Sequence, residues 1–295
     1  MPGKTKDLVV ARTRRELVAA LTPANERGRI VLVPTMGALH AGHVQLMRHG
    51  ADQTGQARLE VAPTVVTSIF VNPTQFGVGE DFGVYPRTFD ADLQRCAEAG
   101  VSVVFAPDVE TMYPGGTGGI TVDAGPLGTI LEGASRPTHF RGVLTVVAKL
   151  FGLVRPDVAV FGEKDYQQLA LISSMTQTLC MPIEIVGCPT VREPDGLAMS
   201  SRNRYLDAAE REVAVTLSTA LRAGAAEAGL GADAVLKAAD AVLSAQPGIE
   251  LDYLALTDAD LGGPVDQGRA RLLVAARVGR TRLIDNSGLT LGSHP

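Results

Sequence analysis

Cysteine and aromatic residues are scarce in this chain of 295 residues. The three cysteines, Cys96, Cys180 and Cys188, cannot all pair within one chain, and none has the C-x-x-C spacing of a zinc or redox site. We therefore expect reduced thiols and a cytoplasmic protein. Aromatic residues make up 4% of the chain, yet hydrophobic residues together make up 45%. This is ordinary for a globular protein and argues against disorder.

An excess of positive charge and long apolar segments are also missing. With 27 Lys and Arg against 32 Asp and Glu, the formal net charge is −5. Nucleic acids and anionic membranes select clustered Lys and Arg, so we expect neither as a general partner. No apolar run approaches the roughly 20 residues of a membrane span, and residues 1–7 lack the apolar core of a signal peptide.

Strand-like and helix-like segments alternate through the first two-thirds of the chain. Strands are predicted at residues 29–34, 65–71, 101–105, 158–161 and 183–186, and helices at residues 42–56, 90–99, 140–154 and 165–179. Gly100 is expected to follow the second helix as its cap, and Asp165 to cap the fourth. Residues 114–128 should be loops with a short strand between them. This alternation predicts a Rossmann-like, doubly wound parallel sheet with helices on both faces.

The pattern changes after Val191. Two Ala-rich amphipathic helices are predicted at residues 207–228 and 232–244, followed by strands at residues 250–256, 271–276 and 282–286. We therefore expect an α/β protein of two domains, a doubly wound domain at residues 1–188 and a smaller α+β domain at residues 189–295.

The segment PTMGALHAGH, residues 34–43, leads from the first predicted strand into the first predicted helix, and we call it the HxGH turn. Ligands of open α/β sheets bind beyond the carboxyl ends of the strands, where helix N-termini offer N–H groups to anions. His40 and His43 share the first helical turn, so both can donate to phosphate oxygens as charge develops on the leaving pyrophosphate. Gly42 lets a nucleotide approach the backbone closely. A lone histidine is usually structural, but this context favours an ATP site.

Met199, Ser200, Ser201 and Arg202 lie just past the predicted domain boundary. Two hydroxyl groups and a guanidinium in succession can hydrogen-bond the phosphates of a nucleotide. Alone, this segment is more readily explained as a helix-capping Ser pair with a solvated Arg. Together with the HxGH turn, it is typical of a mobile basic loop that closes on ATP in adenylyl-transferring enzymes.

Two further polar segments follow predicted strands. In GEKDYQQ, Lys164 could neutralise phosphate charge, Asp165 could cap the helix or accept from a ribose hydroxyl, and Gln168 would project towards the edge of the sheet. An ordinary capping Asp with solvated neighbours explains that segment equally well. In FVNPTQF, Asn72 and Gln75 offer amide groups that suit a hydroxylated small acid better than a hydride cofactor.

Six segments occur in this order: PTMGALHAGH, IFVNPTQF, YPRT, PTHFRGVLTVV, FGEKDYQQ and VREPDGLAMSSRNRYL. One such motif could match by chance, but six in order could not. With them the chain resembles the pantoate–β-alanine ligase (pantothenate synthetase) family over nearly its whole length. The resemblance implies a two-step ligase in which the carboxylate of (R)-pantoate attacks the α-phosphate of ATP and releases pyrophosphate. The amine of β-alanine then attacks the pantoyl adenylate and gives pantothenate and AMP.

The resemblance also implies the roles of individual residues. His43, with His40 beside it, would stabilise the departing pyrophosphate, and Lys164, Ser200, Ser201 and Arg202 complete the implied catalytic set. The implied ATP-binding residues are Met36, Gly37, Ala38, Leu39, His40, Ala41, Gly42, His43, Gly162, Glu163, Lys164, Asp165, Val191, Met199, Ser200, Ser201 and Arg202. Gln75 and Gln168 are implied to contact pantoate, Gln75 also β-alanine, and Asn72 joins them as a substrate residue. The first domain would bind ATP and pantoate, and the second would act as a lid.

The expected cofactors are ATP as co-substrate and Mg²⁺, because the metal ion bridges phosphate oxygens and reduces repulsion between triphosphate and carboxylate. Some relatives carry adjacent acidic residues after YPRT, whereas this chain reads Phe89, Asp90, Ala91 and Asp92. Asp92 is therefore a candidate metal ligand, and metal held by phosphates and water alone is an equal alternative. The lead into the second strand, residues 59–63, also departs from the family and should affect a surface loop. The resemblance also implies a homodimer.

Other functions remain to be weighed. A different HxGH nucleotidyltransferase is the nearest alternative, but this short acidic chain has no basic region for transfer RNA. A regulatory module that senses ATP would not need groups directed at the α-phosphate, and it would release no pyrophosphate when pantoate is added. A dehydrogenase is excluded because no G-x-G-x-x-G follows the first strand.

Overall fold

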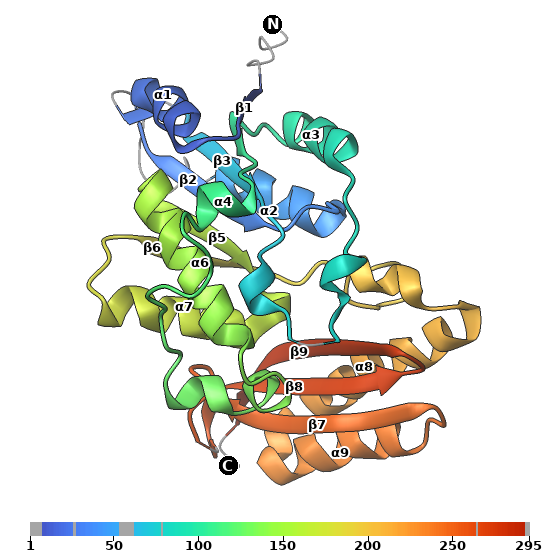
Figure 1. Ribbon diagram of the computed structural model, residues 1–295. Coiled ribbons are helices and arrows are strands. Elements are labelled where there is room, and N and C mark those ends of the chain that lie inside the picture. Colours follow the sequence, from blue (N-terminus) through green and yellow to red (C-terminus); the bar gives the residue numbers. More distant parts are fainter. Residues whose placement is uncertain (1–7, 26–27, 53–61, 78, 264, 293–295) are drawn as a thin grey trace, which may run out of the picture. The chain divides into compact units, whose positions relative to one another are not determined.

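The computed structural model describes residues 8–25, 28–52, 62–77, 79–263 and 265–292 (Figure 1). The chain divides into two compact units. The first unit comprises Met1–Glu163 and Leu171–Cys188, and the second comprises Lys164–Ala170 and Pro189–Pro295. The predicted boundary after residue 188 coincides with one junction between these units, but the inclusion of Lys164–Ala170 in the second unit was not foreseen.

The first unit contains a six-stranded parallel sheet with the strand order β1-β4-β3-β2-β5-β6. Its strands are β1 (Val9–Ala11), β2 (Ile30–Thr35), β3 (Thr64–Ile69), β4 (Val103–Phe105), β5 (Val158–Gly162) and β6 (Glu184–Cys188). The chain runs from β2 outward through β3 to β4, and then returns to add β5 and β6 on the other side of β2. This change of direction confirms the predicted Rossmann-like, doubly wound fold.

Helices cover both faces of this sheet because parallel crossovers are right-handed and their direction reverses. The helices are α1 (Arg14–Asn25), α2 (Ala41–Ala51), α3 (Phe89–Glu98), α4 (Val109–Met112), α5 (Glu132–Ser135), α6 (His139–Val154) and α7 (Tyr166–Thr178). A buried apolar cluster joins α2 and α3 to one face through Val31, Val65 and Val160 of the sheet. On the other face α1 packs against α6, which also contacts β2.

Three sequence expectations need correction. The short β1 and the helix α1 were not predicted. The helix predicted at residues 42–56 is α2, which ends at Ala51, and residues 53–56 lie outside the described residues, as do residues 59–61 of the unusual lead-in. No strand forms within residues 114–128, all of which are described. The backbone N–H of Val122 instead donates to Oγ1 of Thr145 on α6, which replaces a strand partner.

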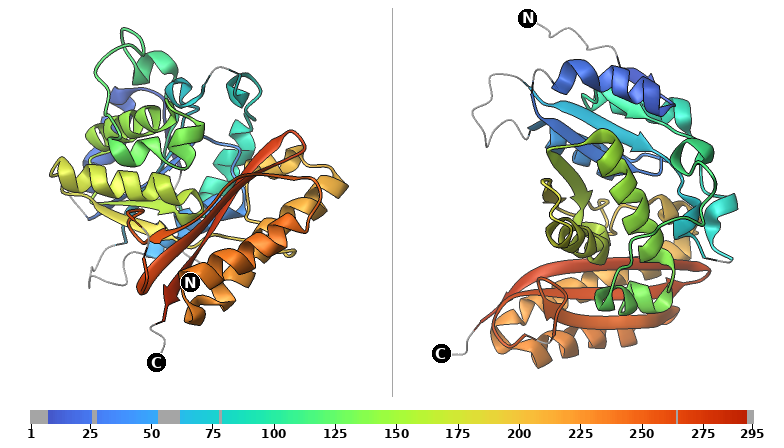
Figure 2. Two further views of the ribbon diagram at one scale, coloured as in Figure 1. Left: turned by 90° about the horizontal axis from the view of Figure 1, so that it is seen from below. Right: turned by 60° about the vertical axis from the view of Figure 1, so that its left-hand side comes forward.

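The second unit contains a three-stranded antiparallel sheet and two long helices. Its elements are α8 (Ala208–Ala226), α9 (Ala232–Ser244), β7 (Ile249–Asp258), β8 (Gly268–Val278) and β9 (Thr281–Leu291). Figure 2 shows α8 and α9 lying along one face of this sheet. They bury a continuous core that includes Leu217, Leu221, Val235 and Leu272. The predicted small α+β unit is thus confirmed.

The helices and the cysteines relate to two expectations from composition, which concern membrane spans and the state of the thiols. No helix among the described residues is long and apolar enough to cross a bilayer. The three cysteines are free, and Cys96 and Cys188 are buried. Burial, helped by the nearby charge of Asp92, raises the pKa of Cys96 to about 12, so this thiol is not a nucleophile at neutral pH.

Candidate active site

Three candidate segments follow three neighbouring strands of the first unit. β2 is hydrogen-bonded to β3 on one side and to β5 on the other. The HxGH turn follows β2, Asn72 and Gln75 follow β3, and the GEKDYQQ segment begins at the end of β5. The direction of winding changes between β2 and β5, and open α/β sheets bind ligands beyond the carboxyl ends of strands at such a point. The motifs therefore lie where open α/β sheets bind ligands.

The HxGH turn has a strained backbone that a buried carboxylate holds in place. Gly37 and Ala38 both have positive φ, at 85° and 50°, and the conformation of Ala38 costs an L-residue about 1–2 kcal/mol. Asp92 of α3 is 1% exposed and accepts from the N–H groups of Ala38 and Leu39, at 3.0 and 2.8 Å. The hydroxyl of Thr88 donates to the same carboxylate at 3.1 Å. These bonds offset the strain and set the shape of the turn.

This geometry gives Asp92 a structural role that was not predicted, beside the metal-ligand role considered above. Both carboxylate oxygens already accept hydrogen bonds inside the protein. Among the described residues, no group of three His, Cys, Asp or Glu is placed to hold a metal ion. The described residues thus offer no centre built from three protein ligands, and the role of Asp92 as a metal ligand stays a prediction.

His40 and His43 are oriented by each other and by the start of α2. His40 is the N-cap of α2, and its Nδ1 accepts from the N–H of Gly42 at 3.2 Å. The backbone N–H of His40 donates to Nδ1 of His43 at 3.3 Å, and the ring centroids lie 4.1 Å apart. Because each Nδ1 is an acceptor, a neutral ring carries its proton on Nε2. In that neutral form both rings present an Nε2–H group near the N-terminus of α2, and their contact with phosphate stays a prediction.

Asn72 and Gln75 form a connected pair after β3. Asn72 is 1% exposed, and its Nδ2 donates to Oε1 of Gln75 at 3.0 Å and to the carbonyl of Gly142 at 3.2 Å. Its Oδ1 accepts from the hydroxyl of Tyr113 at 2.7 Å. Nε2 of Gln75 lies 3.2 Å from Sδ of Met36 in the HxGH turn. Asn72 thus holds Gln75 in place, and its own contact with a substrate stays a prediction.

Sequence reasoning did not identify the residues that support Gln75. They lie at the start of α6 and in the segment just before it. The carbonyl of Gln75 lies 2.9 Å from Nδ1 of His139 and accepts from Arg136 at 3.4 Å. Arg136 also pairs with Glu80. Burial acts to raise the pKa of Glu80, but its hydrogen bond with Arg136 and the charge of that residue lower the pKa below its usual value. Gly142 permits the close approach, since a Cβ there would lie 2.2 Å from the carbonyl oxygen of Thr74.

Part of that support lies in the segment PTHFRGVLTVV, which was used above only for the resemblance. It contains His139 and Gly142. Nothing in its spacing, however, indicates contact with a loop more than 60 residues earlier.

At the end of β5, Glu163–Asp165 forms a 3₁₀ turn that leads directly into α7. Asp165 occupies the position predicted for the helix cap, one residue before the first helical residue. Nζ of Lys164 lies 3.7 Å from a carboxylate oxygen of Asp165. Lys164 and Gln168 belong to the second unit, whereas Gly162 and Glu163 belong to the first.

In the second unit, the chain turns back on itself within residues 191–202, where Arg192 and Ala198 form an antiparallel bridge. We call this segment the Ser-Ser-Arg loop. The N–H of Met199 donates to the carbonyl of Val191 at 2.9 Å, so the two predicted ATP contacts lie side by side. Ser200 is the N-cap of the 3₁₀ helix Ser201–Tyr205, and its hydroxyl oxygen accepts from the N–H of Arg202 at 3.3 Å. The capping interpretation therefore holds for Ser200, and it leaves the phosphate-binding role of the loop as a prediction.

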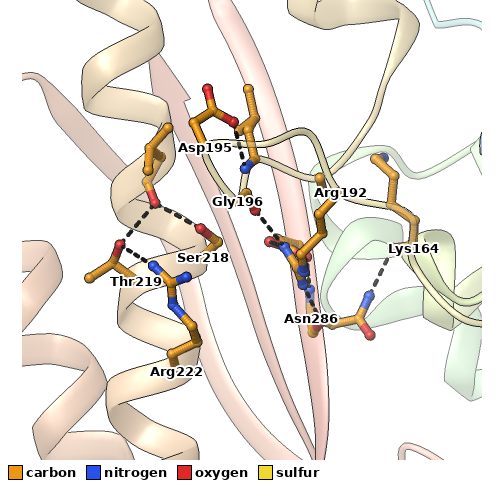
Figure 3. Close-up of polar contacts among 12 residues, drawn as sticks. Lys164, Arg192, Asp195, Gly196, Ser218, Thr219, Arg222 and Asn286 are labelled. Carbon is orange, nitrogen blue, oxygen red and sulfur yellow. Dashed lines mark hydrogen bonds and ion pairs between the residues drawn. The ribbon is translucent and has the colours of Figure 1, made fainter.

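Charged residues hold the Ser-Ser-Arg loop at several points. Arg192 makes two hydrogen bonds to Asp285, at 2.6 and 3.0 Å, and part of this arrangement is drawn in Figure 3. Glu193 accepts from Asn203 at 2.7 Å and from Arg211 at 2.5 Å. The loop is thus fastened to β9 and to α8.

Comparison with known proteins identifies the family of this chain. The model of the family described as pantoate-beta-alanine ligase matches residues 9–288. The chain belongs to this family. Among its curated relatives, the pantothenate synthetase of a Nocardioides strain is 58% identical over 97% of this chain and 86% of the relative. That of Nocardia farcinica is 60% identical over 90% of this chain and 80% of the relative.

Solved structures of the family have the same fold. The crystal structure of pantothenate synthetase from Thermus thermophilus is 46% identical, with a TM-score of 0.86, and the match covers 95% of this chain and 98% of that one. The ligase from Francisella tularensis was crystallised in complex with beta-gamma ATP and beta-alanine. It is 33% identical, with a TM-score of 0.75, over 95% of this chain and 97% of that one.

Proposed function

We propose that this protein is an ATP-dependent ligase that joins (R)-pantoate to β-alanine and produces pantothenate, AMP and pyrophosphate. The observation that carries the proposal is the placement of three family motifs after three adjacent strands, at the point where the winding of the sheet reverses. Membership of the family supplies the identity of the substrates.

In the first step, a carboxylate oxygen of pantoate attacks the α-phosphorus of ATP. The bond from that phosphorus to the bridging oxygen breaks, and pyrophosphate leaves with the bonding electrons. His43 and His40 donate from Nε2 to the phosphate oxygens on which negative charge increases, which lowers the barrier. Lys164, Ser200, Ser201 and Arg202 bind the remaining phosphate oxygens, and residues 36–43 and 162–165, with Val191 and Met199, enclose the nucleotide.

In the second step, the nitrogen of β-alanine attacks the acyl carbon of pantoyl adenylate. The bond between that carbon and the phosphate oxygen breaks, AMP leaves, and the nitrogen loses a proton. Gln75 and Gln168 hold the hydroxyl and carboxylate groups of pantoate, and Gln75 also contacts β-alanine. The bonds from Asn72 and His139 to the Gln75 side chain and backbone fix its position before substrate arrives.

Mg²⁺ enters this proposal with the nucleotide. The described acidic residues do not form a metal centre, so the triphosphate and water are the ligands that we assign to it. When bound, Mg²⁺ would screen the repulsion between the triphosphate and the carboxylate of pantoate. We further propose that the protein is a cytoplasmic homodimer, that residues 1–188 bind ATP and pantoate, and that residues 189–295 act as a lid.

The test separates the two steps. The protein is incubated with ATP, Mg²⁺ and pantoate, and pyrophosphate release is followed before and after β-alanine is added. The proposal expects a burst of pyrophosphate of about one equivalent per active site, then steady production of AMP and the amide. ATP binding without pyrophosphate release would indicate a sensor. Release that depends on an amino acid other than β-alanine would indicate a different ligase.

A further inference from the structure

Two consecutive residues of β9, Asp285 and Asn286, each contact a different segment that is predicted to bind ATP. Both side chains are 4% exposed. Consecutive residues of a strand point to opposite faces of the sheet, so the two side chains serve different neighbours. The function proposed above uses neither of them.

Asp285 holds the Ser-Ser-Arg loop through Arg192. The guanidinium makes two parallel hydrogen bonds to the carboxylate, a geometry that fixes orientation as well as distance. The same guanidinium donates to the carbonyl oxygens of Gly196, at 3.1 Å, and of Asn286, at 3.4 Å (Figure 3). Arg192 therefore joins β9 to the beginning of the loop and to its turn.

Asn286 holds the segment that carries Lys164. Its Nδ2 donates to the backbone carbonyl of Lys164 at 2.8 Å. Two further contacts fasten the same segment to the second unit. The guanidinium of Arg271 lies 3.6 Å from the ring centroid of Tyr166, and the hydroxyl of Tyr166 donates to the carbonyl of Ala259 at 2.7 Å. This explains why Lys164–Ala170 groups with the second unit although it follows β5 in the chain.

We propose that Asp285 and Asn286 are positioning residues that set the Ser-Ser-Arg loop and Lys164 relative to each other, so that both reach one triphosphate. The inference rests on the proposed function. A single rigid dipeptide is an effective positioning device because charged groups directed at a transferring phosphate lose much of their effect when displaced by about 1 Å. Neither side chain touches the substrates itself, and each acts through the segment that it holds.

The test compares Asp285→Asn and Asn286→Ala with Arg282→Gln. Arg282 lies on the same strand and pairs with Asp252 of β7, so it controls for the loss of a polar contact on β9. Exchange of labelled pyrophosphate into ATP with pantoate reports the first step. Reaction of preformed pantoyl adenylate with β-alanine reports the second. Thermal unfolding of each full-length variant reports the fold.

For Asp285→Asn and Asn286→Ala we expect a KM for ATP at least about tenfold higher, or exchange slower by the same factor. We expect the KM for β-alanine and the rate of the second step to change less than about twofold, and Arg282→Gln to match the parent protein. Folded variants with unchanged exchange would overturn the proposal. So would activity that falls in both steps in proportion to the folded fraction.

If Asn286→Ala does not fold, Asn286→Asp keeps the side-chain shape and removes the donor to Lys164, and the same outcomes apply to it. The two hypotheses fail differently. Absence of exchange in the parent protein would reject the proposed function, whereas normal exchange in parent and variants would reject only the positioning role.

Discussion

We proposed that the HxGH turn of the first unit and the Ser-Ser-Arg loop of the second bind the same triphosphate, but different interactions hold the two segments. The turn is held by the carboxylate of Asp92, which is buried and hydrogen-bonded to backbone N–H groups. The loop depends largely on ion pairs of Arg192 and Arg211, whose side chains are about a third exposed. Water and salt weaken exposed pairs far more than buried ones. The turn is therefore held by buried contacts, whereas part of the loop's support, the Arg211 pairs, is open to water and salt.

The largest effect is expected from removing the chemistry of the HxGH turn. His43→Ala should lower the rate of pyrophosphate release by about 100-fold or more, since a lost transition-state donor costs roughly 3 kcal/mol. His49→Ala, on the last turn of the same helix, is the matched control and should keep near-normal turnover. Stopped-flow measurement of pyrophosphate gives both rates. Near-normal activity of the His43 variant would remove the main catalytic assignment.

Breaking the anchor of the same turn should have the next largest effect. Asp92→Asn replaces one acceptor by an amide that faces a backbone N–H, and a charged hydrogen bond of this kind contributes about 1.5–3 kcal/mol. We expect the KM for ATP to rise at least about tenfold. The exposed Asp90, in the same helical turn, provides the control Asp90→Asn.

This variant also separates positioning from metal binding. A titration of Mg²⁺ at saturating ATP should give the same half-saturating concentration for Asp92→Asn as for the parent protein. A large increase in that concentration would return Asp92 to the role of metal ligand.

A smaller and more selective effect is expected beyond β3. Gln75→Ala should raise the KM values for pantoate and β-alanine by about tenfold, because a lost hydrogen bond contributes about 1 kcal/mol or more. The KM for ATP should change little. Steady-state kinetics with each substrate varied in turn measures all three. If only the KM for ATP rose, the substrate pocket would be misplaced.

The smallest effect is expected at the exposed anchor of the Ser-Ser-Arg loop. Arg211→Gln removes the pairs with Glu193 and Asp195, and pairs this exposed contribute about 0–1 kcal/mol. The KM for ATP should therefore rise less than about fivefold, and the difference from the parent protein should shrink as salt increases. Arg222→Gln, on the same helix, is the control. An effect as large as that of Asp92→Asn would remove the contrast between the two segments.

Local patterns in the sequence predicted most of the fold. The apolar runs that became β2, β3 and β5 are long enough to identify, and α9 was predicted with its observed ends. The three residues of β1 are too few to show a pattern, since they become a strand only by pairing with β4. The strand expected within residues 114–128 failed because a side chain of α6 provides the backbone partner.

Local patterns in the sequence also account for what could be predicted of the candidate site. Motifs and resemblance named the residues that are predicted to face the ligand, but the residues that hold them come from distant parts of the chain. Asp92 is 54 positions from Ala38, and Asn286 is 122 positions from Lys164. From the sequence, an acidic residue early in a helix indicates a favourable interaction with the helix dipole or a metal ligand. Only the folded backbone reveals which N–H groups the carboxylate accepts from.

A crystal structure with bound α,β-methylene ATP, in which attack at the α-phosphorus cannot release pyrophosphate, tests the central claim most directly. The claim is that the triphosphate lies beyond the ends of β2 and β5, against the two imidazole rings. The account predicts phosphate oxygens about 3 Å from Nε2 of His40 and His43. A nucleotide bound elsewhere, or rings turned into the core of the first unit, would contradict it.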